Sequence, residues 1–305
     1  MNKLVSVIIP TYSRPVNLKR AINSVLNQSY NNIEIIVVDD NGDGTYNQIR
    51  TEKEINEYMS LNNFRYLKHN KNRNGAAARN TGIKNSKGEY IAFLDDDDEF
   101  SINKIEIQVN ALERLDNTWG GCYCNMQYNG RKIRKTNNKK SGELLEELLL
   151  ETVKFNSSTL LFRKEVCIDL NGFDESYIRH QDWEFMIRFF RKYKLFLPSN
   201  ECLVNRFSSK EHSNAPNGEL FIIIKNKFLN EFKEDIDSCK NKNAIYHKHW
   251  MEVSYTLFSE YNYKLFFHYF TKSVSYQKCS LNDIKVLVKS ACLPIYKKML
   301  SILGK

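Results

Sequence analysis

The 305-residue sequence has no run of about 18 apolar residues, the length that a membrane-spanning helix requires. Its first residues, Met1-Asn2-Lys3, lead directly into a strand-like segment, so we expect neither a transmembrane helix nor a signal peptide and assign the protein to the cytoplasm. Internal repeats and disordered segments are also missing. The length is sufficient for one large domain, or for one domain with an appendage.

Cysteine and histidine do not form the clusters that bind zinc. The seven cysteines are an odd number, and only Cys122 and Cys124 lie close together, without a second pair or a histidine tract. We therefore expect reduced thiols that have no role in metal binding.

The net charge of +9 is spread unevenly along the chain. Between Leu220 and Lys305, fourteen lysines oppose seven aspartates and glutamates. Such a basic segment is compatible with nucleic acid, an anionic membrane or an acidic substrate, and charge alone does not select among them.

The first hundred residues alternate between strand-like and helix-like patterns. Val5–Ile9 and Ile33–Val38 are nearly continuous apolar runs, and Leu18–Leu26 between them has apolar residues at helical spacing. This order predicts an α/β fold with a mainly parallel sheet flanked by helices. In such a fold the ligand crevice lies beyond the carboxyl ends of the strands.

Polar or acidic clusters follow three of the predicted strands. Any one of them would be an ordinary loop, but three at one edge of a sheet indicate a nucleotide and metal site. The clusters are Pro10-Thr11-Tyr12, Asp39-Asp40-Asn41-Gly42 and Asp95-Asp96-Asp97-Asp98.

The third cluster consists of four consecutive carboxylates, which repel one another unless solvent or a cation neutralises them. Carboxylate oxygens suit hard cations such as Mg²⁺ and Mn²⁺. In an extended segment Asp95 and Asp97 would point to one side, toward a ligand, and Asp96 and Asp98 to the other. A solvated acidic turn that ends the strand is the alternative.

Two further residues are candidates for the site. Arg79 lies in the small-residue segment Asn74–Ile83, a predicted helix start that would bring it near a phosphate or base, unless the helix only packs and the arginine is exposed. Asp182 precedes the apolar segment Trp183–Phe190, a predicted buried helix. It either caps this helix or, if burial raises its pKa and it faces the crevice, acts as a base.

Together these segments resemble the family 2 glycosyltransferases of the GT-A fold, over about residues 3 to 215. The matching segments are Val5–Tyr12, Val37–Asn41, Asn74–Asn80, Phe93–Asp98 and Gly172–Glu175 with Gln181–Trp183. The resemblance implies a Rossmann-like catalytic domain at residues 1–218, with a nucleotide-sugar half at about 1–100 and an acceptor half at about 101–218. Residues 219–305 form a basic, aromatic-rich and mostly helical C-terminal region.

The resemblance also implies a role for each candidate residue in binding a nucleotide-sugar donor. Asp95 and Asp97 form the Asp-x-Asp motif, in which Asp97 binds the Mn²⁺ or Mg²⁺ that bridges the diphosphate. His212 is a further candidate ligand of this metal, with a surface histidine as the alternative. The implied donor contacts are Pro10, Thr11, Tyr12, Asp40, Arg79, Asp95 and Asp96.

In the same family Asp182 corresponds to the catalytic base. It would take the proton of the acceptor hydroxyl as that oxygen attacks the anomeric carbon, which inverts the configuration in one displacement. The residue before it departs from the family, which often has glutamate where this chain has Gln181. The resemblance implies a donor that is a UDP-sugar and an acceptor hydroxyl on a glycan or a lipid-linked oligosaccharide, in the synthesis of a capsule, O-antigen or similar surface polysaccharide.

The C-terminal region suggests a membrane contact. Val286–Leu303 has the pattern of an interfacial amphipathic helix, which would hold the protein at the cytoplasmic face of the inner membrane. Helix packing against the catalytic domain is the alternative.

Two other function classes compete with the glycosyltransferase. A metal-dependent nucleotidyltransferase would need a glycine-rich loop with a lysine after the first strand, and Thr11–Pro15 is not such a loop. A basic nucleic-acid-binding protein would explain the lysines, but no recognised binding motif occurs, and the four carboxylates would repel phosphates unless a metal covered them. We therefore expect no nucleic-acid partner.

Overall fold

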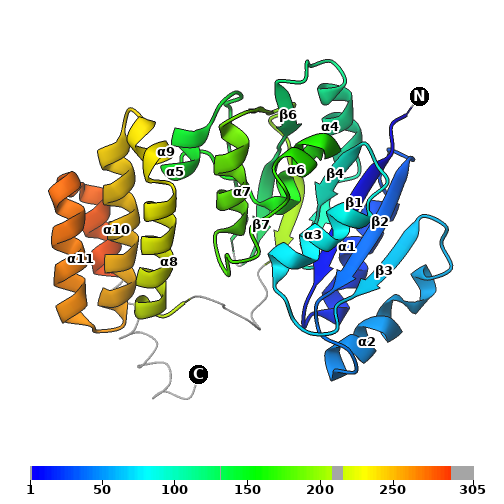
Figure 1. The fold of residues 1–305 in the computed structure, drawn as a ribbon, viewed down its shortest axis with the longest axis horizontal. Helices are drawn as coiled ribbons and strands as arrows, with labels where there is room; N and C mark the ends of the chain where they lie inside the picture. The colour runs from blue at the N-terminus through cyan, green and yellow to red at the C-terminus, as the bar shows by residue number, and fades with distance from the viewer. Residues whose placement is uncertain (1, 131, 208–215, 290–305) are drawn as a thin grey trace. The chain divides into compact units, whose positions relative to one another are not determined.

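The computed structural model describes residues 2–130, 132–207 and 216–289 (Figure 1). The chain forms two compact units, Met1–Leu145 with Val153–Glu211 and Glu146–Thr152 with His212–Lys305. We call them the sheet unit and the helical unit. The predicted division of function between residues 1–218 and 219–305 stays a prediction.

The sheet unit contains a seven-stranded mixed sheet in the order β10-β6-β9-β4-β1-β2-β3. The pairs β1–β2, β1–β4, β2–β3 and β6–β10 are parallel, and only β9 runs antiparallel to its neighbours, so the predicted mainly parallel α/β sheet is confirmed. The strands are β1 (Val5–Thr11), β2 (Ile33–Asp39), β3 (Phe64–Lys68), β4 (Tyr90–Phe93), β6 (Trp119–Cys122), β9 (Leu161–Arg163) and β10 (Lys194–Phe196).

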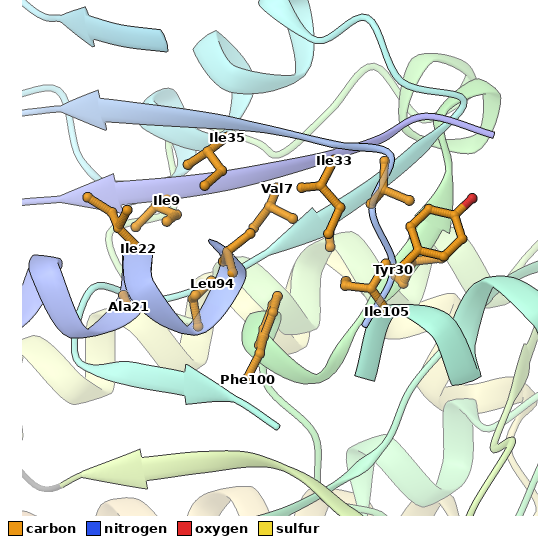
Figure 2. Packing of buried hydrophobic residues seen from close by; sticks show 14 of the residues in the cluster. Val7, Ile9, Ala21, Ile22, Tyr30, Ile33, Ile35, Leu94, Phe100 and Ile105 are labelled. Atoms are coloured by element: carbon orange, nitrogen blue, oxygen red, sulfur yellow. The ribbon is translucent and has the colours of Figure 1, made fainter. Parts of the chain in front are cut away.

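Alternation along β1 separates the two faces of this sheet. Val7 and Ile9 lie in one buried cluster with Ala21 and Ile22 of α1 (Pro15–Leu26) (Figure 2). Ile8 points to the other face, where it meets α3 (Gly75–Asn85) at Gly82; a Cβ there would lie 2.3 Å from the Ile8 side chain. Because only glycine allows this approach, α3 can pack closely against β1.

A second, four-stranded sheet has the order β5-β11-β7-β8. The sequence predicts one strand over Trp119–Tyr128, and this is wrong, since β6 ends at Cys122 in the first sheet and β7 begins at Asn125 in the second. The polar sequence of Asn129–Ser141 predicts a hairpin or a loop, and β8 pairs antiparallel with β7 as in a hairpin. The strands are β5 (Asp98–Phe100), β7 (Asn125–Asn129), β8 (Arg134–Lys135) and β11 (Cys202–Phe207).

The sequence of Ser158–Phe162 predicts a strand, but the strand that forms there begins later. Ser157–Thr159 is a short 3-10 helix, η2, and β9 starts only at Leu161. The side chain of Ser158 donates a hydrogen bond to Asp98, and that of Thr159 donates one to the Asn156 carbonyl. These polar contacts hold the segment in a turn and bring its serines beside the acidic cluster.

The sheet unit contains further helices. Of these, α2 lies beside β3, α4 follows β5 in the chain, and α7 carries Asp182. The helix predicted to begin near Asp182 is present, although its N-cap is His180, so Asp182 is not the cap. The bounds are α2 (Tyr46–Ile55), η1 (Asn56–Tyr58), α4 (Lys104–Leu112), α6 (Lys164–Asp169) and α7 (Gln181–Phe190).

The helical unit confirms the predicted helical C-terminal region. In it Lys225 is fully buried, and its Nζ lies 2.7 Å from a Glu252 carboxylate oxygen, which offsets the cost of burying the charge. Within the described residues no helix is both long and apolar enough to cross a membrane. The helices are α5 (Leu145–Leu149), α8 (Gly218–Glu231), α9 (Lys233–Ser238), α10 (Lys242–Ser259) and α11 (Tyr263–Tyr276), with a further helical stretch at 281–289.

Candidate active site

The four carboxylates form a tight turn between the two sheets. β4 ends at Phe93, β5 begins at Asp98, and the Asp98 amide donates to the Asp95 carbonyl at 3.0 Å. The extended segment assumed from the sequence is therefore wrong, because the chain reverses within these four residues to join the second sheet. Asp96 and Asp98 are buried all the same, and Asp95 and Asp97 stay partly exposed.

Arginine side chains surround this turn, which the sequence did not indicate. Arg14 places Nη1 2.7 Å from Asp97 Oδ2 and 3.2 Å from Asp96 Oδ1. Arg20, one and a half turns further along α1, donates to the Asp97 carbonyl oxygen at 2.7 Å. The beginning of α1 thus supplies two positive charges to the acidic turn.

Two more arginines approach from other elements. Arg79 of α3 donates to Asp95 Oδ1 at 2.8 Å and is only 8% exposed, so the alternative of a surface arginine is wrong. Arg206 of β11 has its pKa raised by the charges of Asp98 and Asp95, which outweigh burial. Loss of one partner of a buried pair such as Arg79–Asp95 costs about 3–5 kcal/mol of stability, so truncation of Arg79 would not be a clean test of function.

The carboxylates of the turn have shifted pKa values despite the four arginines around them. Burial raises the pKa of Asp96 to about 7, against the opposing charge of Arg14. Burial and the Asp95 carboxylate raise the pKa of Asp98, also to about 7. Burial would raise the pKa of Asp95 as well, but Arg79 and Arg206 lower it.

The residues at this turn fit a hard divalent cation that protein and substrate hold jointly. Asp98 Oδ1 is buried without a hydrogen-bond partner in the described part of the chain, and Asp97 offers partly exposed carboxylate oxygens. No three His, Cys, Asp or Glu side chains of residues 2–130, 132–207 and 216–289 are arranged to hold a metal by themselves. Mg²⁺ is commonly held by one or two carboxylates together with substrate phosphates, so Asp97 would need a diphosphate to complete the site.

The end of β1 contacts the turn directly. Thr11 donates its hydroxyl to Asp96 Oδ2 at 2.8 Å, and the Tyr12 amide points to the same oxygen at 3.4 Å. Tyr12 is 53% exposed beside this contact, and Pro10 precedes Thr11 on the strand. Two of the three predicted residues, Thr11 and Tyr12, thus lie beside Asp96.

Asp40, at the end of β2, organises the loop that leads into α3. Its two carboxylate oxygens accept hydrogen bonds from the Arg73 and Asn74 amides, both at 2.8 Å, and from the side chains of His69 and Asn72. Asp40 is 3% exposed. It therefore fixes the conformation of this loop, a role that the sequence did not indicate.

Asp182 is connected to the acidic turn through η2. Its Oδ2 accepts from the Ser157 amide at 3.3 Å, and the Ser157 hydroxyl donates to Asp95 Oδ1 at 3.0 Å. Arg79 gives a second connection, since Nη1 donates to Gln181 Oε1 at 3.2 Å. Burial raises the pKa of Asp182, and Arg79 opposes this shift.

The structure therefore brings Thr11, Arg79, Asp95, Asp97 and Asp182 to one edge of the sheet. His212, the second predicted metal ligand, lies outside the described residues. The sequence did not indicate four of the residues at the site, Arg14, Arg20, Ser157 and Arg206. Of these, only Arg14 lies next to one of the three polar clusters, two residues after Tyr12.

Comparisons with known proteins identify the family and the fold of the chain. The family model described as glycosyl transferase family 2 matches residues 6–170. The amylovoran biosynthesis glycosyltransferase AmsB of Erwinia amylovora is 30% identical over 234 residues, which cover 71% of this chain and 75% of AmsB. Other relatives are longer, and the chain spans 31% and 39% of the length of two glycosyltransferases from Rickettsia species.

Solved structures share the fold. Staphylococcus aureus TarS 1–349 in complex with UDP-GlcNAc has a TM-score of 0.61 at 17% identity, over 90% of this chain and 89% of that one. The mannosyltransferase PcManGT from Pyrobaculum calidifontis, in complex with GDP-Man and Mn²⁺, has a TM-score of 0.56 at 16% identity, over 98% and 82%. The fold is that of the GT-A glycosyltransferases.

Because the family model matches more than half of the 305 residues, the chain belongs to glycosyl transferase family 2.

Proposed function

We propose that the protein is an inverting, metal-dependent glycosyltransferase. It transfers a sugar from a nucleoside diphosphate sugar, with a UDP-sugar as the expected donor, to a hydroxyl of a glycan or lipid-linked acceptor in surface-polysaccharide synthesis. The observation that carries the proposal is the hydrogen-bond network that joins a partly buried carboxylate on α7, Asp182, to the acidic turn through Ser157. A base and the acidic turn are thereby held at one place.

On the donor side, the chain binds and orients the nucleotide. Thr11, Tyr12 and the loop shaped by Asp40 lie at the ends of β1 and β2, where parallel sheets bind nucleotides. Asp97 would hold the cation, with Asp95 beside it. When bound, Mn²⁺ or Mg²⁺ stabilises the negative charge that grows on the departing diphosphate.

On the acceptor side, Asp182 takes the proton. The Ser157 amide binds one of its oxygens and leaves the other to accept from the acceptor hydroxyl. As that hydroxyl oxygen bonds to the anomeric carbon, the bond to the diphosphate oxygen breaks on the opposite face, and the proton moves to Asp182. The pKa raised by burial makes Asp182 a stronger base than an exposed aspartate.

A donor panel tests this function. We expect the purified protein with Mn²⁺ to release a nucleoside diphosphate from one donor among UDP-, GDP- and TDP-sugars. Coupled detection of the released diphosphate measures it, with Asp182→Asn as the matched control. Absence of both release and nucleotide binding with every donor would contradict the proposal.

We also propose that the helical unit contacts an anionic membrane, where a lipid-linked acceptor would be found. Most of the predicted amphipathic segment, residues 290–303, lies outside the described residues. The preceding helical stretch exposes an apolar stripe beside Lys285 and Lys289, as interfacial helices do. The stripe consists of Leu281, Ile284 and Val288, exposed by 78%, 50% and 59%.

Vesicle flotation tests the membrane contact. We expect the protein to float with phosphatidylglycerol vesicles, and less with phosphatidylcholine vesicles, since the lysines attract anionic lipid. Replacement of Leu281, Ile284 and Val288 by serine should abolish flotation because the apolar area is lost. Equal flotation of this variant and the wild type, or none by either, would refute the contact.

A further inference from the structure

Arg14 occupies the carboxylate that the proposed metal would need. Its Nη1 lies 2.7 Å from Asp97 Oδ2 and 3.2 Å from Asp96 Oδ1, within the range of charge-assisted hydrogen bonds. A divalent cation on Asp97 would stand next to this guanidinium, and the two positive charges would repel. Arg14 and a cation therefore compete for the same carboxylate.

Arg14 is held at the turn by the carboxylates of Asp96 and Asp97. Its side chain is 23% exposed, and in the described part of the chain its hydrogen bonds are all with Asp96 and Asp97. The side chain of Arg79, by contrast, is 10% exposed and also binds Gln181 and Ser157. Release of the Arg14 side chain thus breaks two ion pairs and, within the described residues, no other side-chain hydrogen bond.

Arg20 differs from Arg14 in what it binds. It donates to the main-chain oxygen of Asp97, not to the carboxylate, and its guanidinium stacks 4.0 Å from the centre of the Phe207 ring. It adds positive charge at the turn without covering a metal-binding oxygen. This makes Arg20 a matched control for the effect of charge alone.

We propose that Arg14 is an internal counter-ion of the acidic turn, which leaves Asp97 only when a cation and a nucleoside diphosphate bind together. This rests on the proposed function for the identity of the ligands. A cation alone must displace Arg14, which then has no new anionic partner. A diphosphate supplies that partner beside the N-terminus of α1, where anions are favoured. Each ligand therefore raises the affinity for the other, and by the same factor.

The position of Arg14 agrees with such a movement. It directly precedes Pro15, the first residue of α1, and follows Ser13, which has a φ of 61°. The Ser13 amide donates a hydrogen bond to Asn41 Oδ1 at 2.7 Å, which fixes the backbone before Arg14. Arg14 can therefore leave Asp97 by rotation of its side chain. The change requires only a new side-chain conformer.

Titration of Mn²⁺, followed by the electron paramagnetic resonance signal of free Mn²⁺, tests the proposal without an activity assay. We expect Arg14→Gln to bind Mn²⁺ alone about tenfold more tightly than the wild type, since the competing charge is gone. The gain in Mn²⁺ affinity that UDP produces should fall by about the same factor. Arg20→Gln should change the affinity for Mn²⁺ alone by less than about threefold.

Two results would overturn the proposal. One is an Arg14→Gln variant that binds Mn²⁺ alone no more tightly than the wild type, and the other is an equal gain in Arg20→Gln. The double variant Arg14→Gln/Asp97→Asn should lose the gain, and a gain that persists would also contradict it, because the metal would then lie elsewhere. Failure of UDP, GDP and TDP to bind any form would refute the proposed function, while the titrations with Mn²⁺ alone still decide the role of Arg14.

Discussion

Replacement of Asp182 by asparagine should lower kcat for sugar transfer by about 10²–10⁴-fold, the usual contribution of a general base. Asparagine keeps the shape of the side chain and an oxygen that accepts from the Ser157 amide, but it cannot take a proton. Nucleotide affinity should stay within about twofold of the wild type, because Asp182 acts on the acceptor. Initial rates of transfer and calorimetric titration with UDP and Mn²⁺ measure the two effects.

Asp169→Asn is the matched control, since Asp169 is an exposed carboxylate that pairs with Lys192 on the surface. It should leave kcat unchanged. A normal rate for Asp182→Asn would show that the base is a different group.

The pH dependence of the wild type gives a second readout of the same residue. A base must be unprotonated, so the rate falls as the pH drops through the pKa of Asp182. An ordinary aspartate has a pKa of about 3.9. Because burial raises the pKa of Asp182, the rate should begin to fall at a higher pH than it would for an ordinary aspartate. The acid limb should be absent from the residual activity of Asp182→Asn.

Asp97→Asn should remove the Mn²⁺-dependent part of nucleotide binding, a loss of roughly 10- to 100-fold in affinity. A neutral amide holds a divalent cation much less tightly than a carboxylate does. Calorimetric titration of UDP, with Mn²⁺ and with a chelator, measures the difference between the two conditions. In Asp97→Asn this difference should disappear.

Glu99→Gln is the control for Asp97. Glu99 lies two residues further on, is partly exposed and contacts Arg20 at 3.4 Å, so it changes the charge near the turn without changing the proposed ligand. It should keep the response to Mn²⁺. If Asp97→Asn kept it as well, Asp97 would not be the ligand.

Much of the fold could be predicted from local periodicity. Val5–Thr11, Pro15–Leu26 and Ile33–Asp39 form the expected strand, helix and strand, since continuous apolar runs and helical spacing are local signals. The split between β6 and β7 was missed because only Tyr123 and Cys124, with no glycine or proline, separate the two strands. The change of sheet between them depends on pairing with distant strands.

The candidate site was predictable in part, for a similar reason. The acidic cluster and Asp182 occur in segments with a recognisable pattern. The arginines that surround the cluster come from positions 14, 20, 79 and 206, which only the folded chain brings together. The charge of the turn therefore could not be derived from the four carboxylates alone.

The extended geometry assumed for Asp95 to Asp98 shows how a local rule fails at such a site. Alternation holds in a strand, but here the chain must pass from one sheet to another within four residues, and a hydrogen-bonded turn does this. The turn still exposes Asp95 and Asp97 in preference to Asp96 and Asp98, because the latter two bind Thr11 and Ser158 inside the protein.

The configuration at the transferred anomeric carbon tests the central claim most directly. With the donor that the panel identifies, proton NMR of the product formed in the first turnovers reports whether the new bond is α or β. A single displacement with Asp182 as base predicts the configuration opposite to that of the donor. Retention of the donor's configuration would contradict this account.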